Sequence, residues 1–397
     1  MGLLLFNKQI KNKLLMEKKN NEKIINENDK CKNEIIPLII ETNGNKNKYL
    51  NINNLAQNNN LLNYISLIKI ISATFVVMMH TNRNYYIFNI YWISTNIITS
   101  FAYCAVPLFS LCIGATLLNF NEKYGLKEYF KRRFKKMIIP ILGWNIIYYF
   151  YRIYIIKNFK LEDLNFIILY RIYFLSKLNP IINSLRIFII GYMIIPLIAY
   201  VEKKNKIKIY SYCFIALFIN QSLIPYLIAM IKPDLNYWPY NYNFGYVIYL
   251  FSGYIIQNYK FNYKYKYLIY ISGIISLLLR LTISHYITIK NKKVDKSQLG
   301  YVNLPCVIYS CSVFLFFKEY SIYLFKIIDP KYINQIGSLS MGPFFLHYMI
   351  IWILPYLLNY NEYSFNYRFF GSFIISFLCY IITAIIKKIP IIKYLTP

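Results

Sequence analysis

The sequence predicts an all-α, polytopic integral membrane protein with about ten transmembrane helices and with both its N-terminus and its C-terminus in the cytoplasm. Three observations predict this class. Apolar residues make up 57% of the 397 residues and charged residues only 15%, whereas a soluble domain carries about 25%. The apolar residues form runs near membrane-spanning length, separated by short polar loops, and the mean hydropathy is +0.36. Lysine and arginine gather in alternate loops, which sets the orientation.

Ten apolar stretches account for the expected spans. They cover residues 62–81, 95–118, 137–156, 184–200, 210–230, 242–257, 268–287, 301–317, 339–358 and 369–387. A further apolar segment, 165–179, contains Arg171 and Lys177, so we interpret it as interfacial or re-entrant. If this segment spans the membrane, the chain crosses eleven times and the later topology is reversed.

The charge of the loops favours the ten-helix topology. With the N-terminus inside, the loops 119–136, 201–209, 258–267 and 318–338 lie in the cytoplasm, and each carries several basic residues. The loop 288–300 is the exception, because it carries four lysines although this topology places it on the external side. Both ends of the chain are therefore expected in the cytoplasm.

Three segments of different character follow from this division. Residues 1–60 are rich in Lys, Asn and Glu and are expected to form a disordered cytoplasmic tail. Residues 61–390 form the transmembrane domain, and 391–397 form a short cytoplasmic tail.

The basic excess has a membrane explanation. The formal charge of +29 comes from 45 Lys and Arg against 16 Asp and Glu, which would suggest nucleic acid for a soluble chain. Because these residues cluster in loops beside apolar runs, we expect contact with membrane lipid and no nucleic-acid partner. The seven cysteines form no CxxC pair, so we expect neither a disulfide nor a metal site.

Two ionisable residues lie inside the first apolar run. Ten residues separate Lys69 from His80, which places them about 16 Å apart along a helix. Either residue has a simpler explanation: Lys69 could snorkel to the interface, and His80 could be an ordinary hydrogen-bonded interfacial residue. Both are expensive to place in hydrocarbon, however, and together they suit an enzyme that handles a reactant across the membrane.

A basic run precedes the third span, in Lys131-Arg-Arg-Phe-Lys-Lys-Met-Ile-Ile-Pro140. On a helix Arg133 and Lys136 share one face, and Arg132 and Lys135 share another. Such a face could hold the phosphates of a nucleotide-bearing donor, although basic clusters beside membranes are also common without a ligand.

These features resemble membrane acyltransferase family 3. The resemblance rests on Lys69-x10-His80, on Arg133-x2-Lys136 followed by Pro140, and on four further motifs. The further motifs are Ala105-Val-Pro107-Leu-Phe109 with Gly114, Gly191-Tyr192 with Pro196, Gly253-Tyr254, and Ser338-Leu-Ser-Met-Gly342-Pro-Phe-Phe-Leu-His347. The resemblance covers about residues 62–388. Three positions depart from the usual pattern: Lys136 where Arg is commoner, Ile113 before Gly114, and Asn183-Ser184-Leu185-Arg186 in place of an aromatic stretch.

The resemblance implies a transmembrane acyltransferase domain. Members of the family move an acyl group, commonly acetyl, from acyl-CoA to a hydroxyl of a surface polysaccharide, lipopolysaccharide or lipid-linked sugar. It also implies ten helices, a multi-pass location in the cell membrane, here the cytoplasmic membrane of a bacterium, and acyl-CoA (acetyl-CoA) as co-substrate without a metal. The oligomeric state stays open.

The resemblance and the residue chemistry together assign candidate roles. His80 is the candidate general base, because a neutral imidazole can take the proton of an attacking hydroxyl. Its orienting partner is unidentified, and transfer through an acyl-histidine also stays open. Lys69 or Arg133 could stabilise the oxyanion. The candidate residues for the CoA phosphates are Arg132, Arg133, Lys135 and Lys136, and those for the acceptor are His347 and Trp238.

Two other functions remain open from the sequence. A transporter or exporter of a glycan or glycolipid would also carry charge inside the membrane, although no internal repeat is visible. An inactive partner within a glycan-assembly complex is the third hypothesis.

Overall fold

A computed structural model describes residues 47–82, 88–157, 180–231, 246–295, 297–298, 300–358 and 361–396, and the regular structure of these residues is entirely helical. Residues 1–46, most of the expected tail, and the segment 165–179 lie outside the described residues. The chain divides into a unit of residues 1–56 and a unit of residues 57–397. The first unit is described only in its last residues, where the first helix begins, and everything that follows concerns the second unit.

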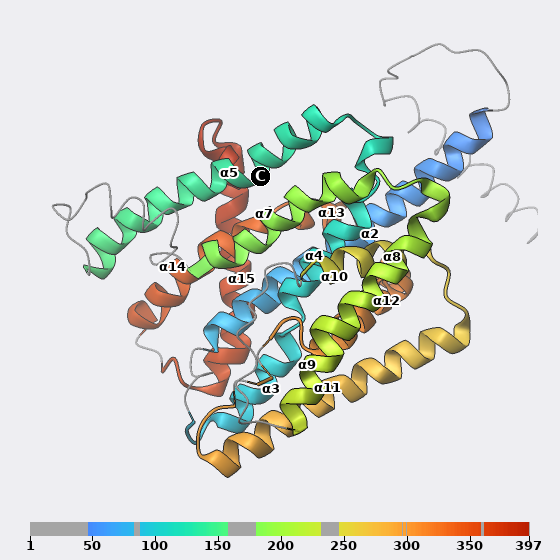
Figure 1. Cartoon of the computed structure of the whole chain (residues 1–397). Coiled ribbons are helices and arrows are strands. Elements are labelled where there is room, and N and C mark those ends of the chain that lie inside the picture. Colours follow the sequence, from blue (N-terminus) through green and yellow to red (C-terminus); the bar gives the residue numbers. More distant parts are fainter. Residues whose placement is uncertain are drawn as a thin grey trace, which may run out of the picture. The chain divides into compact units, whose positions relative to one another are not determined.

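The helices follow one another closely along the chain (Figure 1). The α-helices are α2 (Asn47–Thr81), α3 (Trp92–Ala102), α4 (Ala105–Leu117), α5 (Leu126–Tyr151), α7 (Pro180–Ala199), α8 (Lys203–Leu217), α9 (Ile224–Ile231), α10 (Val247–Asn258), α11 (Tyr263–Asn291), α12 (Leu304–Leu324), α13 (Pro330–Gly337), α14 (Met341–Leu358) and α15 (Phe365–Lys388). Short 3-10 turns are η3 (Phe120–Glu122) and η8 (Ile392–Leu395), and π-helical segments are η4 (Arg152–Ile156) and η6 (Phe218–Leu223). Each of the ten expected spans overlaps one or more of these helices.

Seven helical stretches of the described residues are long and apolar enough to cross a membrane. They are Asn63–Thr81, Trp92–Glu122, Leu126–Ile156, Lys203–Ile231, Tyr263–Asn291, Leu304–Leu324 and Phe365–Lys388. The pair α13 and α14, bent by 60°, would make an eighth. The apolar part of α7, Phe188–Ala199, is shorter than these seven stretches. Helix α10 is also short, with 12 residues. The protein is thus a multi-pass helical membrane protein, while the ten crossings and the cytoplasmic ends stay predictions.

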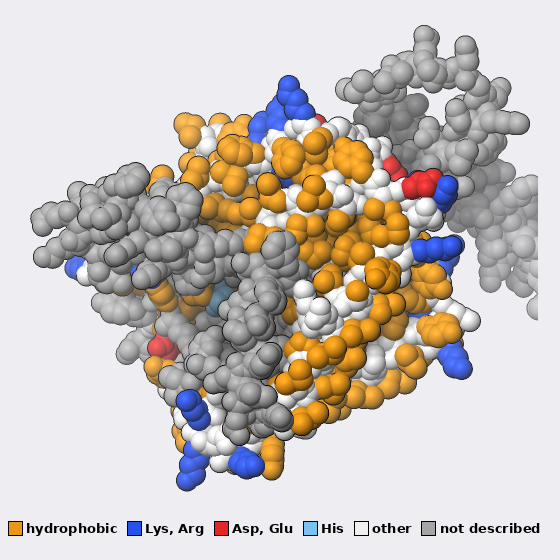
Figure 2. Space-filling view, in the orientation of Figure 1, with side chains coloured by type: hydrophobic (Ala, Val, Ile, Leu, Met, Phe, Trp, Pro, Cys, Tyr) orange, Lys and Arg blue, Asp and Glu red, His pale blue; other side chains and the backbone are white. Residues whose placement is uncertain are grey.

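The surface agrees with a lipid environment. Apolar side chains cover much of the described face in Figure 2, and Lys and Arg side chains lie at its edges. Large apolar residues such as Leu197 and Phe377 are 80% and 64% exposed. Exposure of this kind is unfavourable in water and natural in hydrocarbon.

The close approach of α4 and α10 organises one side of the bundle. A Cβ atom added to Gly114 would overlap the backbone carbonyl of Leu250, and one added to Gly253 would overlap the carbonyl of Leu111. The two glycines therefore let the two backbones touch, as small residues do between transmembrane helices.

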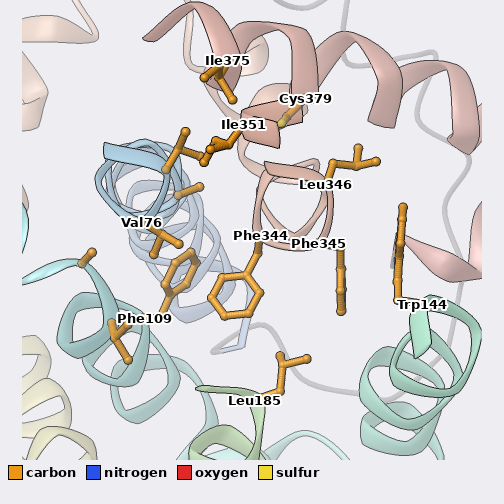
Figure 3. Close-up of a cluster of buried hydrophobic side chains, with 14 of the residues drawn as sticks. Val76, Phe109, Trp144, Leu185, Phe344, Phe345, Leu346, Ile351, Ile375 and Cys379 are labelled. Carbon is orange, nitrogen blue, oxygen red and sulfur yellow. The ribbon is translucent and has the colours of Figure 1, made fainter. Parts of the chain in front are cut away.

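An aromatic core lies between α14 and its neighbours (Figure 3). Phe344 packs edge-on against Phe109 of α4, and Phe345 stacks on Trp144 of α5 with ring centroids 5.7 Å apart. Tyr148 of α5 donates to the carbonyl oxygen of Phe345 at 2.6 Å. These contacts fix α14 against α4 and α5 just before its histidine.

Three lysines close the ends of other helices. Lys206 donates to the carbonyl of Leu118 after α4, at 3.0 Å, and Lys318 to that of Ile256 in α10, at 2.6 Å. Lys387 donates to the carbonyl of Ser338 after α13, at 2.8 Å. The last carbonyls of a helix lack intrahelical partners and carry partial negative charge, which an ammonium group satisfies.

Candidate functional site

His80 lies in the last turn of α2 and faces α14. Its Nδ1 shares a hydrogen bond of 2.8 Å with the hydroxyl of Tyr348. Its ring stacks on that of His347 with centroids 5.0 Å apart and an interplanar angle of 29°. The Tyr348 ring lies 4.6 Å from each of the two imidazoles. The structure therefore brings together two predicted residues, His80 and His347, and adds a tyrosine that the sequence did not single out.

The tautomer of His347 follows from its position on α14. Its Nδ1 lies 2.8 Å from the carbonyl oxygen of Pro343, one turn earlier. Because a carbonyl oxygen can only accept, Nδ1 carries the hydrogen, and the neutral ring keeps a lone pair on Nε2. The side chain is 1% exposed, and Nε2 has no hydrogen-bond partner among the described residues. A buried acceptor without a partner is unfavourable, and a hydroxyl donor at this atom would satisfy it.

A second part of the site is a group of cations from α2, α5 and α15. Lys136 is in electrostatic range of four other cations, which are Arg133, Lys69, Lys387 and Arg132. Within the described part of the chain, Lys69, Arg133 and Lys136 form no ion pair with a carboxylate. Like charges repel, so this arrangement of neighbouring cations favours a bound anion.

Arg133 points inward between α5 and α7. Its guanidinium lies over the ring of Tyr192, 5.4 Å from the centroid, and near that of Tyr129. The Tyr129 hydroxyl donates to the carbonyl of Tyr192 at 2.9 Å and fixes this seam. Arg133 Nε is buried without a hydrogen-bond partner in the described residues. The sequence predicted that Arg133 shares a helix face with Lys136, and the structure places a buried donor, Arg133 Nε, on that face.

The second pair of predicted phosphate ligands lies differently. Arg132 Nε donates to Glu128 Oε1 at 2.8 Å, and its guanidinium lies over the Tyr124 ring at 4.5 Å. Lys135 is exposed beside it. The role of this face in donor binding stays a prediction. Arg132 is paired with a carboxylate, whereas Arg133 has no carboxylate partner among the described residues.

The two centres lie at different heights along α2. Lys69 belongs with the cations and His80 with the imidazole pair, so about 16 Å of helix separates them. The structure therefore places Lys69 beside the cations and apart from the imidazole pair, and its candidate catalytic role stays a prediction. The arrangement suits a substrate with an anionic head and a long arm that carries its reactive group to the histidines.

A buried polar network directly follows His80 and was also missed by sequence reasoning. Arg368 of α15, fully buried, donates to Asn82 Oδ1 at 3.1 Å, to Ser94 Oγ at 2.6 Å and to Thr95 Oγ1. An arginine at the mouth of an expected span gave a signal, but nothing local connected it to His80.

Two further predictions concern Trp238 and the cysteines. Trp238, with Asp234, falls outside the described residues. Six cysteines lie in the described part of the chain, all unpaired, and no group of three or more His, Cys, Asp or Glu residues there could hold a metal ion.

Comparison with known proteins gives the family. The family model described as an acyltransferase domain matches residues 62–387. The chain belongs to acyltransferase family 3. No curated protein and no solved structure matches the chain.

Membership in acyltransferase family 3 confirms the resemblance seen in the motifs. The matched range includes every described candidate residue and excludes the basic N-terminal segment. The protein is therefore a membrane acyltransferase in general terms, which favours transfer chemistry over transport.

Proposed function

We propose that the protein is an acyl-CoA-dependent O-acyltransferase that moves an acyl group, commonly acetyl, to a hydroxyl of a cell-surface polysaccharide, lipopolysaccharide or lipid-linked sugar. We place it in the cytoplasmic membrane of a bacterium. The observation that carries the proposal is the pairing of two centres on α2: cations without carboxylate partners at Lys69 and paired imidazoles at His80.

Arg133, Lys136 and Lys69 bind the phosphates of the donor in this proposal. Guanidinium and ammonium groups form charge-assisted hydrogen bonds with phosphate oxygens, and Arg133 Nε has no hydrogen-bond partner among the described residues. Arg132 and Lys135 add long-range attraction at the exposed rim. The flexible pantetheine arm of CoA then spans the distance to His80.

In the transfer at His80, one proton moves from the acceptor hydroxyl to the imidazole and then from the imidazolium to the leaving thiolate. The acceptor oxygen attacks the thioester carbonyl carbon while the imidazole of His80 takes the hydroxyl proton. The tetrahedral oxyanion collapses, the carbon–sulfur bond breaks, and the CoA thiolate takes the proton back from the imidazolium. The His347 lone pair accepts a hydrogen bond from an acceptor hydroxyl, and the Tyr348 hydroxyl orients the His80 ring.

A labelling experiment tests the assignment. Membranes that contain the wild type, His80→Ala or Arg133→Ala receive radiolabelled acetyl-CoA, and label is counted in the glycan and lipid fractions. We expect strong labelling by the wild type, none by His80→Ala, and recovery of Arg133→Ala only at raised donor concentration. His285→Ala is the matched control, because this third histidine lies on α11, away from both centres. Equal labelling by all four proteins would refute the proposal.

A further inference from the structure

We propose that Arg368 is a positioning residue for the acyl transfer, which holds the end of α2 so that the His80 ring meets its partners on α14. The inference rests on the proposed role of His80. It concerns a residue that contacts neither proposed substrate, and it assigns a purpose to a buried charge.

The burial of Arg368 is the first observation. Its side chain is 0% exposed, and the described residues give it no carboxylate partner. A guanidinium buried among neutral groups is unfavourable, because it loses its hydration without a counter-charge. Its Nε is also without a hydrogen-bond partner among the described residues. An arginine in such a place needs a reason beyond stability.

The bonds of Arg368 join three helices. Its Nη1 donates to Asn82, directly after α2, and to Thr95 in α3, and its Nη2 donates to Ser94, also in α3. Its backbone carbonyl in α15 accepts from the hydroxyl of Thr81 at 3.0 Å. The two residues that follow His80 are thus both attached to Arg368.

Asn82 extends the network from Arg368 to α3. Its Nδ2 donates to the carbonyl of Thr95 at 2.9 Å and to the hydroxyl of Thr99 at 2.8 Å, while its Oδ1 accepts from Arg368. Both ends of the Asn82 amide are therefore fixed. The chain cannot rotate about the end of α2 without breaking several buried bonds.

This fixation matters for the orientation of His80. The ring contacts α14 through Tyr348 and His347, and α14 packs against α15, which carries Arg368. One helix pair therefore holds the imidazole ring and also the backbone that carries it. A planar guanidinium with several donors in fixed directions can join Asn82, Ser94 and Thr95 at once, which a lysine cannot do.

The test compares substitutions that separate geometry from folding. Arg368→Met removes the guanidinium, Arg368→Lys keeps its charge without the planar fork, and Thr95→Val removes one acceptor while keeping the shape. Arg280→Met is the matched control, because Arg280 is 4% exposed and lies over the Tyr103 ring, so it too is a buried cation. Initial rates of label transfer from acetyl-CoA in membranes are measured against donor concentration. Rates are normalised to folded protein from size-exclusion chromatography.

We expect kcat to fall by about 10²-fold in Arg368→Met, because small misplacements of reacting groups have effects of this size. Arg368→Lys should fall less, Thr95→Val by several-fold, and KM for acetyl-CoA should stay constant in all three. Arg280→Met should keep kcat per folded molecule. If Arg368→Met does not fold, the Thr95→Val and Arg368→Lys results decide.

Failure of the proposed function and failure of the positioning role can be distinguished when His80→Ala is measured in the same series. Full activity of His80→Ala would refute the proposed function. Loss of activity in His80→Ala together with a normal kcat in Arg368→Lys and Thr95→Val would refute only the positioning role.

Discussion

Two residues of α14 contact the imidazole of His80. The Tyr348 hydroxyl binds Nδ1, and the His347 ring covers one face of the imidazole. The Tyr348 hydroxyl can donate to Nδ1 or accept from it, and when Nδ1–H donates to the tyrosine oxygen, Nε2 of His80 is free to take a proton. We propose Tyr348 as the orienting partner that the sequence left unidentified, a phenol instead of a carboxylate.

Replacing Tyr348 by phenylalanine tests this contact. One hydrogen bond contributes about 0.5–1.5 kcal/mol, so we expect kcat for label transfer from acetyl-CoA to fall about three- to tenfold in Tyr348→Phe. Tyr380→Phe is the control, because the Tyr380 hydroxyl on α15 is buried without a partner among the described residues. An unchanged rate in Tyr348→Phe, equal to that of the control, would contradict the orienting role.

The inward and outward faces of the basic run should differ in donor binding. Arg133→Ala should raise KM for acetyl-CoA by about tenfold or more, because a hydrogen bond to a charged group contributes about 1.5–3 kcal/mol. Arg132→Ala should have a smaller effect, since Arg132 is bound to Glu128. Both are read from initial rates at several salt concentrations, where the Arg132 effect should disappear first. A larger effect for Arg132 would reverse our assignment of the faces.

Ionisable residues within apolar runs were visible from the sequence, because their cost in a membrane marks them locally. His80 and His347 were found in that way, whereas the Arg133–Lys136 pair was found as part of a basic run beside an apolar span. Tyr348 and Arg368 were not linked to His80, because the bonds that join them to α2 span 268 and 286 residues. Tyrosine is also too common to carry a signal, with 43 in the chain.

At the scale of the elements, helix pairing depends on two glycines. Gly114 and Gly253 face the opposite backbone across the α4–α10 contact, each against a carbonyl group. Backbone atoms cannot move aside as a flexible side chain can, so a methyl group at either position must separate the helices.

Gly253→Ala should therefore destabilise the fold by about 1–3 kcal/mol. Thermal unfolding in detergent measures this change. Gly125→Ala is the control, because a Cβ at Gly125 meets no atom within 4 Å and its φ of −76° suits alanine. Equal melting temperatures for the two variants would contradict the close approach of α4 and α10.

Hydrophobic runs located the helices but not their breaks. The stretch 95–118 is divided between α3 and α4, and 210–230 contains the π-segment η6. The stretch 339–358 is α14, bent by 60° from α13. Length and hydropathy fix where a helix can cross the membrane, whereas these breaks depend on local hydrogen bonds and on packing against other helices.

At the scale of the molecule, orientation is the main prediction left to measure. The positively charged loops predict that both ends of the chain lie in the cytoplasm. A reporter fused after Lys393 should report cytoplasmic, and one inserted at Asn361 should report the opposite side. A reporter after Lys393 that reads external would overturn the even number of crossings.

The three lysines that close helix ends have a consequence for redesign of orientation. Lys206, Lys318 and Lys387 lie in α8, α12 and α15 and contribute to the basic charge from which the cytoplasmic side is predicted, and they also donate to carbonyl groups at the ends of α4, α10 and α13. Moving these charges to the opposite side in order to invert the protein would leave carbonyl groups at the ends of three helices without these hydrogen-bond donors. An inverted variant would need replacement caps at all three places, so insertion and packing cannot be re-engineered independently in this chain.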